Sequence, residues 1–224
     1  MPGACQEQNK KLSAISVIIP TLDAAHLLPP LLAQLADLGE VILADGGSAE
    51  VPLGARVVAS ARGRGAQLAA GAAAAGGEWL LFLHADTRLE AGWEGAILAA
   101  MQTPGQAAYF RFALDDASPQ ARRLEAAVAW RCRWLALPYG DQGLLMSRGL
   151  YEAVGGFQPL PLMEDVDIAR RLGRARLRAM PARAVTSAER WRRDGWWRRS
   201  ARNISILSLY FTGVPPRWLA RLYG

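Results

Sequence analysis

The stretch Trp79-Leu80-Leu81-Phe82-Leu83-His84-Ala85-Asp86-Thr87 decides the fold prediction for this chain. It is a continuous apolar run of strand length that stops at a histidine and an aspartate. Ligands of open α/β sheets bind at the carboxyl ends of the strands, so this strand would deliver Asp86 to a binding crevice. A carboxylate there suits a hard divalent cation that carries phosphates. The same segment is also compatible with a buried strand that ends in a polar turn.

The segments around this stretch alternate between predicted strands and helices. Their apolar residues run nearly without interruption, which is typical of parallel strands covered on both faces. We predict early strands at 15–20, 41–45, 55–59 and 79–83, and helices at 30–38 and 63–76. The fold class is therefore α/β, with a mixed, mostly parallel, Rossmann-like sheet flanked by helices.

Beyond Gly92 the pattern changes. We predict a strand at 108–114 with one exposed face, a second strand at 143–147, and helices at 120–137, 164–172 and 191–211. The chain shows no internal repeat and no linker. The layout predicts one domain over 1–190, with a nucleotide-binding half (about 14–90) and an acceptor-binding half (about 91–190), followed by a basic, Trp-rich helical extension over 191–224.

Composition restricts the class of protein. A chain of 224 residues that is 51% hydrophobic can bury a full core. Cys5 and Cys132 are far apart and lack metal-ligand spacing, so we expect neither a disulfide framework nor a zinc site, and we favour a reducing cytoplasm. The polar N-terminus lacks the apolar core of a signal peptide, and no run reaches the roughly 18 apolar residues that span a bilayer.

The net charge of +6 is concentrated at the C-terminus, where residues 170–224 carry 14 arginines and two acidic residues. Tryptophans lie among these arginines at Trp191, Trp196, Trp197 and Trp218. Three interpretations stay open: an interfacial helix on the anionic inner face of a membrane, a helix packed on its own domain, and a homodimer contact. RNA-binding aromatic motifs are absent from the sequence, so we expect no nucleic-acid partner.

Three early strands end in, or lead to, an acidic residue. The segments are Pro20-Thr21-Leu22-Asp23, Ala44-Asp45-Gly46-Gly47-Ser48 and His84-Ala85-Asp86. Because the carboxyl ends of parallel strands meet at one edge of a sheet, these groups are expected to line one crevice. No GxGxxG or GxxxxGK[ST] motif is present, which argues against a dinucleotide or P-loop site.

Arg62-Gly63-Arg64-Gly65-Ala66-Gln67 precedes the Ala-rich predicted helix. Arginines beside the N–H groups of a helix start can bind an anion, although an ordinary glycine turn with solvated arginines would have the same sequence.

In the second half, Gly140-Asp141-Gln142-Gly143 is predicted to form a polar turn over the crevice. Glu164 and Asp165 stand together at a predicted helix start, where the helix dipole favours their ionised forms. An ionised carboxylate beside a bound sugar could act as a general base on an acceptor hydroxyl, and simple helix capping is the alternative.

Taken together and in this order, the segments resemble a family-2 glycosyltransferase with the GT-A fold. They are particularly similar to a compact bacterial subfamily associated with radical-SAM and selenium-related proteins. The likeness covers nearly the whole chain. The matching pieces are SVIIPTLD (16–23), ADGGS (44–48), RGRGAQLAAGAAAAGG (62–77), LLFLHADT (80–87), PYGDQGLLMSR (138–148), MEDVDIARRL (163–172), TSAERW (186–191) and YFTGVPPRWLARLYG (210–224).

The resemblance implies an inverting transfer of a sugar from a nucleotide-diphosphate donor to an unidentified acceptor hydroxyl. It also implies that Asp86 holds a Mg²⁺ or Mn²⁺ ion that bridges the diphosphate. Because His84 replaces the first acid of the usual Asp-x-Asp motif, metal attachment rests on Asp86 and the diphosphate. The implied contacts to the nucleotide come from Pro20, Thr21, Asp23, Asp45, Gly46, Arg64 and Asp86.

The same resemblance implies that Asp165 deprotonates the acceptor, with Glu164 as the second candidate. Residues near the acceptor and the diphosphate would be Asp141, Gln142, Arg190 and Trp191. Two other functions stay open at this stage. One is a sugar-phosphate nucleotidyltransferase, and the other is a non-catalytic protein that binds through its basic tail.

Overall fold

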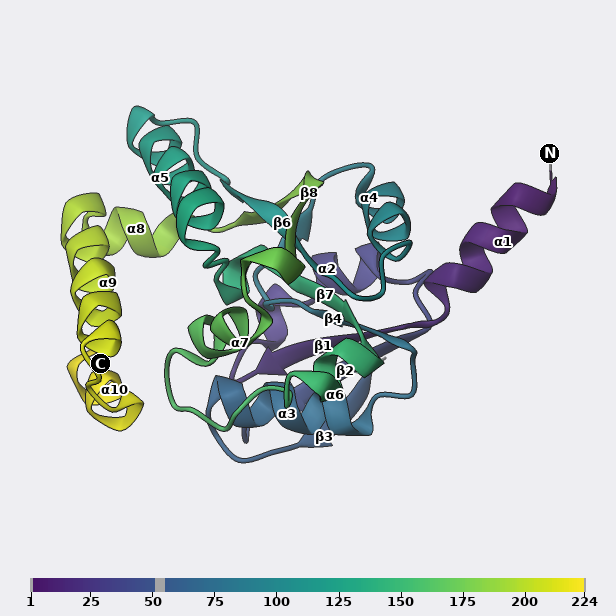
Figure 1. The fold of residues 1–224 in the computed structure, drawn as a ribbon, viewed down its shortest axis with the longest axis horizontal. Helices are drawn as coiled ribbons and strands as arrows, with labels where there is room; N and C mark the ends of the chain where they lie inside the picture. Colours follow the sequence, from purple (N-terminus) through teal and green to yellow (C-terminus); the bar gives the residue numbers. More distant parts are fainter. Residues whose placement is uncertain (1, 51–54, 224) are drawn as a thin grey trace.

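The computed structural model describes residues 2–50 and 55–223 (Figure 1). Its centre is an eight-stranded sheet in the order β3-β2-β1-β4-β7-β6-β8-β5. The strands are β1 (Ile15–Thr21), β2 (Glu40–Asp45), β3 (Arg56–Ala59), β4 (Trp79–Phe82), β5 (Arg88–Leu89), β6 (Ala107–Leu114), β7 (Leu144–Ser147) and β8 (Leu177–Thr186).

The helices lie on both faces of this sheet and at the two ends of the molecule (Figure 1). They are α1 (Pro2–Leu12), α2 (Pro29–Gln34), α3 (Arg64–Ala74), α4 (Trp93–Ala100), α5 (Pro119–Leu135), α6 (Arg148–Ala153), α7 (Glu164–Leu172), α8 (Glu189–Asp194), α9 (Trp196–Phe211) and α10 (Pro216–Tyr223). The early strands and helices agree with the sequence prediction to within a few residues.

The sheet is parallel on one side and mixed on the other. Strands β1 to β4 are parallel, because β1 pairs with β2 and β4, and β2 pairs with β3. Strand β7 then runs antiparallel to β4 and β6. The chain moves outward from β1 through β2 to β3 and returns to the other side of β1 at β4. The carboxyl ends of β1 and β4 therefore flank a switch point, where α/β sheets bind ligands.

Two apolar cores explain the continuous hydrophobic runs. Ile15, Val17 and Ile19 of β1 join a cluster with α2 and α4, whereas Ile18 joins a second cluster with α3, α5 and α7. A Cβ atom added at Gly71 would lie 2.4 Å from the Ile18 Cγ2 atom. Helix α3 therefore approaches β1 as closely as its glycine allows, which brings the start of α3 to the edge of the sheet where the strands end.

The structure departs from the sequence prediction in several places, and elements such as α1, α4, β5 and α6 were also not predicted. The helix expected over 191–211 is interrupted at Gly195, which has φ 85°, so α8 and α9 are separate helices. Strand β6 is buried on both faces except at Arg111, because β7 and β8 flank it and helices cover it. The ten-residue strand β8 was not predicted, because its exposed positions hold Arg178, Pro181 and Arg183 and interrupt the apolar run.

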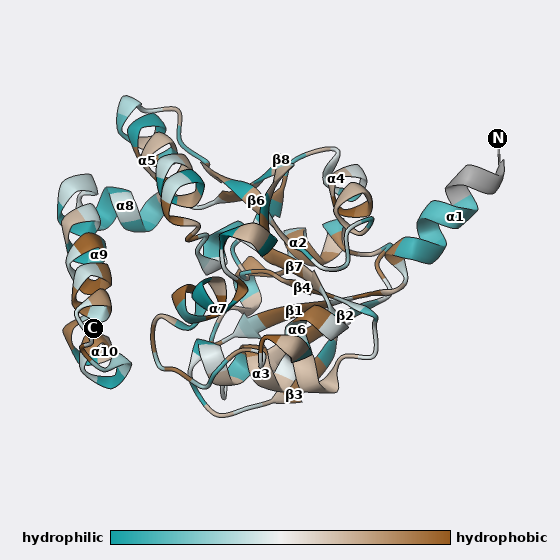
Figure 2. Cartoon of the chain, in the orientation of Figure 1, coloured by the Kyte–Doolittle hydropathy of each residue, from teal (hydrophilic) through white to brown (hydrophobic). Residues whose placement is uncertain are grey.

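The C-terminal helices α8 to α10 lie at the end of the molecule opposite α1 (Figure 1). Ile206 and Leu219 are buried, and Leu207 and Tyr210 pack against the cluster formed by Leu137, Val166 and Ala169. Apolar residues also occur elsewhere along α9 (Figure 2), and Trp197 is 75% exposed. The inner face of the extension thus packs on its own chain. Within the described ranges, every helix is too short or too polar to cross a bilayer.

Candidate active site

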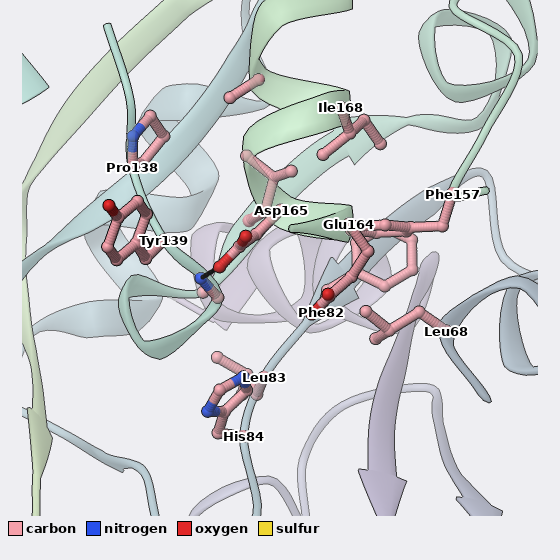
Figure 3. A pocket seen from close by; sticks show the side chains of 14 residues that line it. Leu68, Phe82, Leu83, His84, Pro138, Tyr139, Phe157, Glu164, Asp165 and Ile168 are labelled. Atoms are coloured by element: carbon pink, nitrogen blue, oxygen red, sulfur yellow. Dashed lines mark hydrogen bonds between the residues drawn. The ribbon is translucent and has the colours of Figure 1, made fainter. Parts of the chain in front are cut away.

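A cleft lies beyond the end of β4, between the start of α3, the start of α7 and the C-terminal helices. It brings together six of the residues that the sequence singled out. They are Arg64, Asp86, Asp141, Asp165, Arg190 and Trp191. Glu164 lines a smaller apolar recess beside it, together with Asp165 and His84 (Figure 3). We call the first cavity the cleft and the second the recess.

The other predicted residues lie outside these two cavities. Thr21 and Asp45 end β1 and β2 and form a compact group with Asp23, Gly47 and Ser48, here called the strand-end cluster. Pro20 lies within β1, one residue before Thr21, and Gly46 follows Asp45. Six of the predicted residues therefore line the cleft, but the strand-end cluster does not form part of its wall. The expectation that all three acidic strand ends line one crevice is wrong, because only Asp86 lines the cleft.

Hydrogen bonds saturate the Asp45 carboxylate. One oxygen accepts from the backbone N–H groups of Gly47 and Ser48, both at 2.9 Å, and the other accepts from the Thr21 hydroxyl at 3.1 Å and from the Ser48 hydroxyl. Burial alone would raise the pKa of Asp45, but these donors outweigh burial and lower the pKa below its usual value. Asp45 is therefore an ionised carboxylate that fixes the loop after β2.

Asp23 closes the same loop from the other side. Its carboxylate accepts from the backbone N–H of Ala49 at 3.1 Å, and its own N–H donates to the Ser48 hydroxyl at 2.8 Å. Asp23 has φ 51°, which is uncommon for a residue other than glycine.

Gln67 of α3, which the sequence analysis did not single out as a functional residue, ties this cluster to the cleft. Its buried amide donates to the backbone oxygens of Thr21 at 2.6 Å and Ala44 at 2.9 Å. A Cβ atom at Gly46 would lie 3.1 Å from the Gln67 Nε2 atom, so the chain passes close to this side chain. Helix α3 begins one turn earlier at Arg64, so one helix fixes both the strand ends and the first arginine of the cleft.

Arg64 is the electrostatic centre of the cleft. Its Nε atom donates to a Glu164 oxygen at 2.6 Å, and a terminal nitrogen lies 3.6 Å from an Asp165 oxygen. Burial would lower the pKa of Arg64, but the negative charges of Glu164 and Asp165 dominate and raise it. The pairing joins residues 100 positions apart in the chain, and no local sequence signal reveals it.

The two acids at the start of α7 have different surroundings (Figure 3). The Glu164 side chain is only 2% exposed, and its second oxygen has no hydrogen-bond partner among the described residues. Burial, followed by the neighbouring Asp165 charge, raises the pKa of Glu164 despite the opposing effect of Arg64. Glu164 is thus committed to Arg64 inside the recess.

Asp165 faces the cleft as well as the recess. One of its oxygens accepts from the Gly140 N–H at 3.0 Å, and the other accepts from the Val166 N–H at 2.8 Å. Asp165 therefore binds a backbone N–H within the first turn of α7 and also reaches the cleft. The N-cap residue of α7 is Met163, and no side chain caps the helix there, so helix capping does not account for Asp165.

The turn over residues 140–142 places the Asp141 carboxyl in the cleft and the Gln142 side chain in the core. Burial, with the negative charges of Asp165 and Asp86, raises the pKa of Asp141 to about 6. One Asp141 oxygen is buried without a partner in the described part of the chain. Gln142, by contrast, is 2% exposed and donates to the Phe110 oxygen at 3.1 Å. Its side chain supports the turn from within the fold and does not line the cleft.

His84 is held as a neutral imidazole. Burial lowers its pKa to about 3, and the positive charges of Arg64 and Arg190 add to the effect. A Cβ atom at Gly140 would lie 2.7 Å from the His84 Nε2 atom, so only glycine allows the turn to approach this closely. The sequence did not reveal this packing, because the two residues are far apart along the chain.

The donor set of the cleft fits a cation that arrives with its own phosphate ligands. Among the described residues, no three His, Cys, Asp or Glu side chains are grouped closely enough to enclose an ion. Asp86 does line the cleft, and the buried, unpartnered Asp141 oxygen lines it too. One or two carboxylates combined with substrate phosphates is the usual arrangement for Mg²⁺, which keeps several waters.

The far wall of the cleft comes from the C-terminal helices. It consists of Arg190 and Trp191 from the α8 segment, Arg199 and Asn203 from α9, and Tyr223 from α10. The Arg199 guanidinium lies 5.3 Å from the centre of the Trp191 ring. Arg199, Asn203 and Tyr223 were not predicted as site residues, although the density of arginine and tryptophan in this segment pointed to the region.

Solved structures show which class of protein has this architecture. Glucosyl-3-phosphoglycerate synthase from Mycobacterium tuberculosis, in complex with Mn²⁺, UDP-glucose and phosphoglyceric acid, is similar with a TM-score of 0.56. The match has 22% identity and covers 78% of this chain and 72% of that chain. TarS 1–349 from S. aureus, in complex with UDP-GlcNAc, matches with a TM-score of 0.58 and 16% identity, over 77% of this chain and 58% of that chain. The fold is that of the GT-A glycosyltransferases, as predicted.

Residues 16–159 match the family model described as Glycosyl transferase family 2. The chain therefore belongs to glycosyl transferase family 2, and the protein is a glycosyltransferase. No curated protein sequence matches the chain. Membership of this family sets aside two of the three functions that the sequence left open, namely the nucleotidyltransferase and the non-catalytic binding protein.

Proposed function

We propose that this enzyme transfers a sugar from a nucleotide-diphosphate sugar to an acceptor hydroxyl, with inversion at the anomeric carbon. One observation carries the proposal: Asp165 faces the same cleft as Asp86 and Arg64, and backbone N–H groups fix both of its oxygens. A fixed carboxylate opposite a bound sugar can take the proton of an attacking hydroxyl. The radical-SAM and selenium-associated subfamily is the branch of the family in which we place the chain.

The strand-end cluster and the first half of the chain, about 14–90, would hold the donor. Thr21, Asp23 and Asp45, with Pro20 and Gly46 in the same loops, would contact the base and ribose. The saturated hydrogen bonds of Asp45 support this role, because they fix the loop that a nucleotide would meet. Helix α3 links that loop to Arg64, which would face the nucleotide region of the donor.

Asp86 would hold the divalent cation, Mg²⁺ or Mn²⁺, with the donor diphosphate as its other ligands. When bound, such an ion stabilises the negative charge that develops on a departing diphosphate. The solved neighbour from M. tuberculosis contains Mn²⁺ with UDP-glucose, which supports a divalent ion here. Arg190 would add a fixed positive charge beside the same group.

The acceptor half, about 91–190, would supply the proton acceptor. Asp165 removes the proton of the acceptor hydroxyl, the new glycosidic bond forms to that oxygen, and the bond to the diphosphate breaks. Glu164 is the weaker candidate for this task, because its charge is engaged by Arg64 in the recess. Asp141 faces the same cleft, and Gln142 holds its turn from below.

The test begins with a donor screen. Purified protein with Mn²⁺ is incubated with UDP-, GDP- and TDP-sugars, and thermal shift and donor hydrolysis are recorded. Binding and slow hydrolysis of at least one donor are expected. Asp165→Asn should retain donor binding and lose turnover, whereas Glu152→Gln, an exposed acid on α6, should match the wild type. Failure of every donor to bind would refute the proposal, and NMR of the product anomer tests inversion.

We also propose that the outer face of α9 rests on an anionic membrane surface inside the cell. The large apolar residues Trp197, Ile204 and Phe211 are 75%, 64% and 50% exposed at seven-residue spacing, and Arg198 and Arg202 accompany them. Tryptophan and arginine on one helix are typical of interfacial binding. A second copy of the chain would bring like charges together, so a homodimer through this face is disfavoured.

Vesicle sedimentation distinguishes the two possible partners of the outer face of α9, an anionic membrane and a second copy of the chain. Binding to phosphatidylglycerol vesicles that weakens with salt and with Trp197→Ser is expected, while phosphatidylcholine vesicles bind little. Concentration-dependent dimerisation without vesicle binding would replace the lipid with a second copy. The cytoplasmic location inferred from the sequence is part of this proposal.

A further inference from the structure

We propose that the C-terminal helices form an acceptor subsite that selects an acceptor bearing a phosphate group. This inference rests on the proposed sugar transfer and specifies its second substrate. The cleft continues into a groove lined by Arg190, Arg193, Asp194, Arg198, Arg199, Arg202 and Tyr223. Arg190, Arg199 and Tyr223 line both cavities, so the groove opens into the cleft that holds Asp165.

The groove carries a surplus of positive charge. Among the described residues that line it, Asp194 alone is acidic, against five arginines. Asp194 already contacts Arg193 at 2.9 Å, Arg199 at 2.7 Å and Arg202 at 3.8 Å. A single carboxylate cannot neutralise this cluster, and an anionic ligand would complete its charge balance.

Arg199 is the residue best placed to meet that anion. Its side chain is 11% exposed and held between Asp194 and the Trp191 ring. One terminal nitrogen donates to Asp194, but the Nε–H is buried without a partner in the described chain. A buried donor left unpaired destabilises the protein, so an oxygen of a ligand at this point would be bound favourably.

Asn203 stands one turn further along α9, on the same helix face as Arg199. Its amide oxygen is also buried without a partner among the described residues, and it also lines the cleft. The two side chains therefore lie one turn apart on α9 and leave one N–H donor and one oxygen acceptor unpaired among the described residues. Guanidinium groups bind phosphate through parallel hydrogen bonds, and an amide oxygen can receive a hydroxyl hydrogen. A hydroxylated phosphate ester matches both groups.

The position of the groove assigns it to the acceptor and not to the donor. The proposed donor contacts lie at the strand ends, at Arg64 and at Asp86. Arg64, Asp86 and Asp165 line the cleft but not the groove, whereas Arg193, Arg198 and Arg202 line the groove but not the cleft. The groove therefore leaves the cleft on the side formed by the C-terminal helices.

Two sources can supply the phosphate group of the acceptor, a soluble phosphorylated polyol or a lipid with a phosphate headgroup.

The first measurement tests this inference separately from the proposed function. A nucleoside diphosphate with Mn²⁺ first saturates the donor site, and calorimetry then measures binding of inorganic phosphate, of glycerol phosphate and of vesicles that contain phosphatidic acid. If no nucleoside diphosphate binds, the proposed function fails, and phosphate binding to the free protein still tests the subsite.

The wild type is expected to bind phosphate in the presence of the nucleotide, and Arg199→Gln should weaken this binding about 10–100-fold, the range of one charged hydrogen bond. Arg202→Gln, which removes a more exposed member of the groove, should give a smaller loss and guards against misfolding of the first variant. Arg123→Gln, on the exposed face of α5, removes the same charge elsewhere and should bind like the wild type.

Transfer assays complete the test. The ratio of KM for glycerol to KM for glycerol phosphate should exceed about ten in the wild type and fall toward one in Arg199→Gln. Preference for the vesicle or for the soluble ester identifies the source, and either preference supports the subsite. The inference is overturned if phosphate binds equally well to the wild type and Arg199→Gln, or if the phosphate makes no difference to the acceptor while the donor is still used.

Discussion

The strand-end cluster and the cleft are both polar, but they differ in how their hydrogen bonds are satisfied. Around Asp45, four donors saturate one carboxylate. In the cleft and its recess, buried atoms of Asp141, Glu164, Arg199 and Asn203 have no partner among the described residues. The comparison teaches that the strand-end cluster is held in shape by its own hydrogen bonds before any ligand arrives, whereas the cleft and its recess keep buried hydrogen-bonding groups that a ligand could satisfy.

The largest expected effect tests the cleft. Asp165→Asn should lower the rate of sugar transfer about 10²–10⁴-fold, because the general base is lost. Its folding stability should fall by about 1–3 kcal/mol, because the amide oxygen can accept from only one of the two backbone N–H groups and the amide NH₂ group then faces the other. Steady-state transfer and thermal unfolding measure the two quantities. If the Asp165→Asn enzyme transfers sugar at the wild-type rate, Asp165 has no part in the mechanism.

The next effect tests the strand-end cluster. Asp45→Ala should lower the free energy of unfolding by about 2–4 kcal/mol at neutral pH, because it removes several hydrogen bonds to one buried charge. The pKa of Asp45 is lowered in the folded state, so its stabilisation is present above the unfolded pKa near 4 and is lost as the pH falls further. Urea unfolding at pH 7 and pH 3 measures both. Asp37→Ala, an exposed acid without a role, is the control.

Asp141 should behave in the opposite way to Asp45. Its pKa is raised to about 6, so the folded chain is penalised once the carboxyl ionises, and wild-type stability falls as the pH rises from about 4 to above 6. Asp141→Asn removes this penalty. In the ligand-free protein it should gain about 2–3 kcal/mol relative to the wild type at pH 8, and nothing at pH 4. Equal pH profiles of the two proteins would show that Asp141 is not held in an unfavourable site.

The smallest effect tests one further unpartnered group. The Thr87 hydroxyl, directly after Asp86, is fully buried and has no hydrogen-bond partner in the described chain. Thr87→Val keeps the shape and removes the hydroxyl, and should raise the free energy of unfolding by up to about 1 kcal/mol. A loss of stability in chemical unfolding would reveal a bond that this hydroxyl makes in solution.

Much of the fold and part of the site could be predicted from local sequence. Strands β1, β2 and β4 are runs of apolar residues, and the rule that parallel strands end at one edge brought Asp86 to the cleft. Strand β8 was missed because its arginines alternate with small residues, a pattern that composition alone does not distinguish from a loop. The continuous helix over 191–211 was wrong because one glycine adopts positive φ within a helical pattern.

The unpredicted parts of the site depend on contacts between distant residues. The Arg64–Glu164 pair, the packing of Gly140 on His84 and the burial of Gln142 each join segments that only the tertiary structure brings together. Sequence indicated that a carboxylate stood at the start of α7, but not which of the two acids an arginine would bind. That choice depends on burial, which is a property of the whole fold.

Gly140 gives the site an unusual dependence on the absence of a side chain. The Gly140 N–H donates to the Asp165 carboxylate, and the His84 ring occupies the space that a Cβ atom at position 140 would need. Only the backbone of Gly140 therefore separates the Asp165 carboxylate from His84 at the end of β4. Side-chain substitutions cannot change the thickness of this backbone. Evolution or design can change the walls around these two groups freely, but altering their spacing requires rebuilding the loop itself.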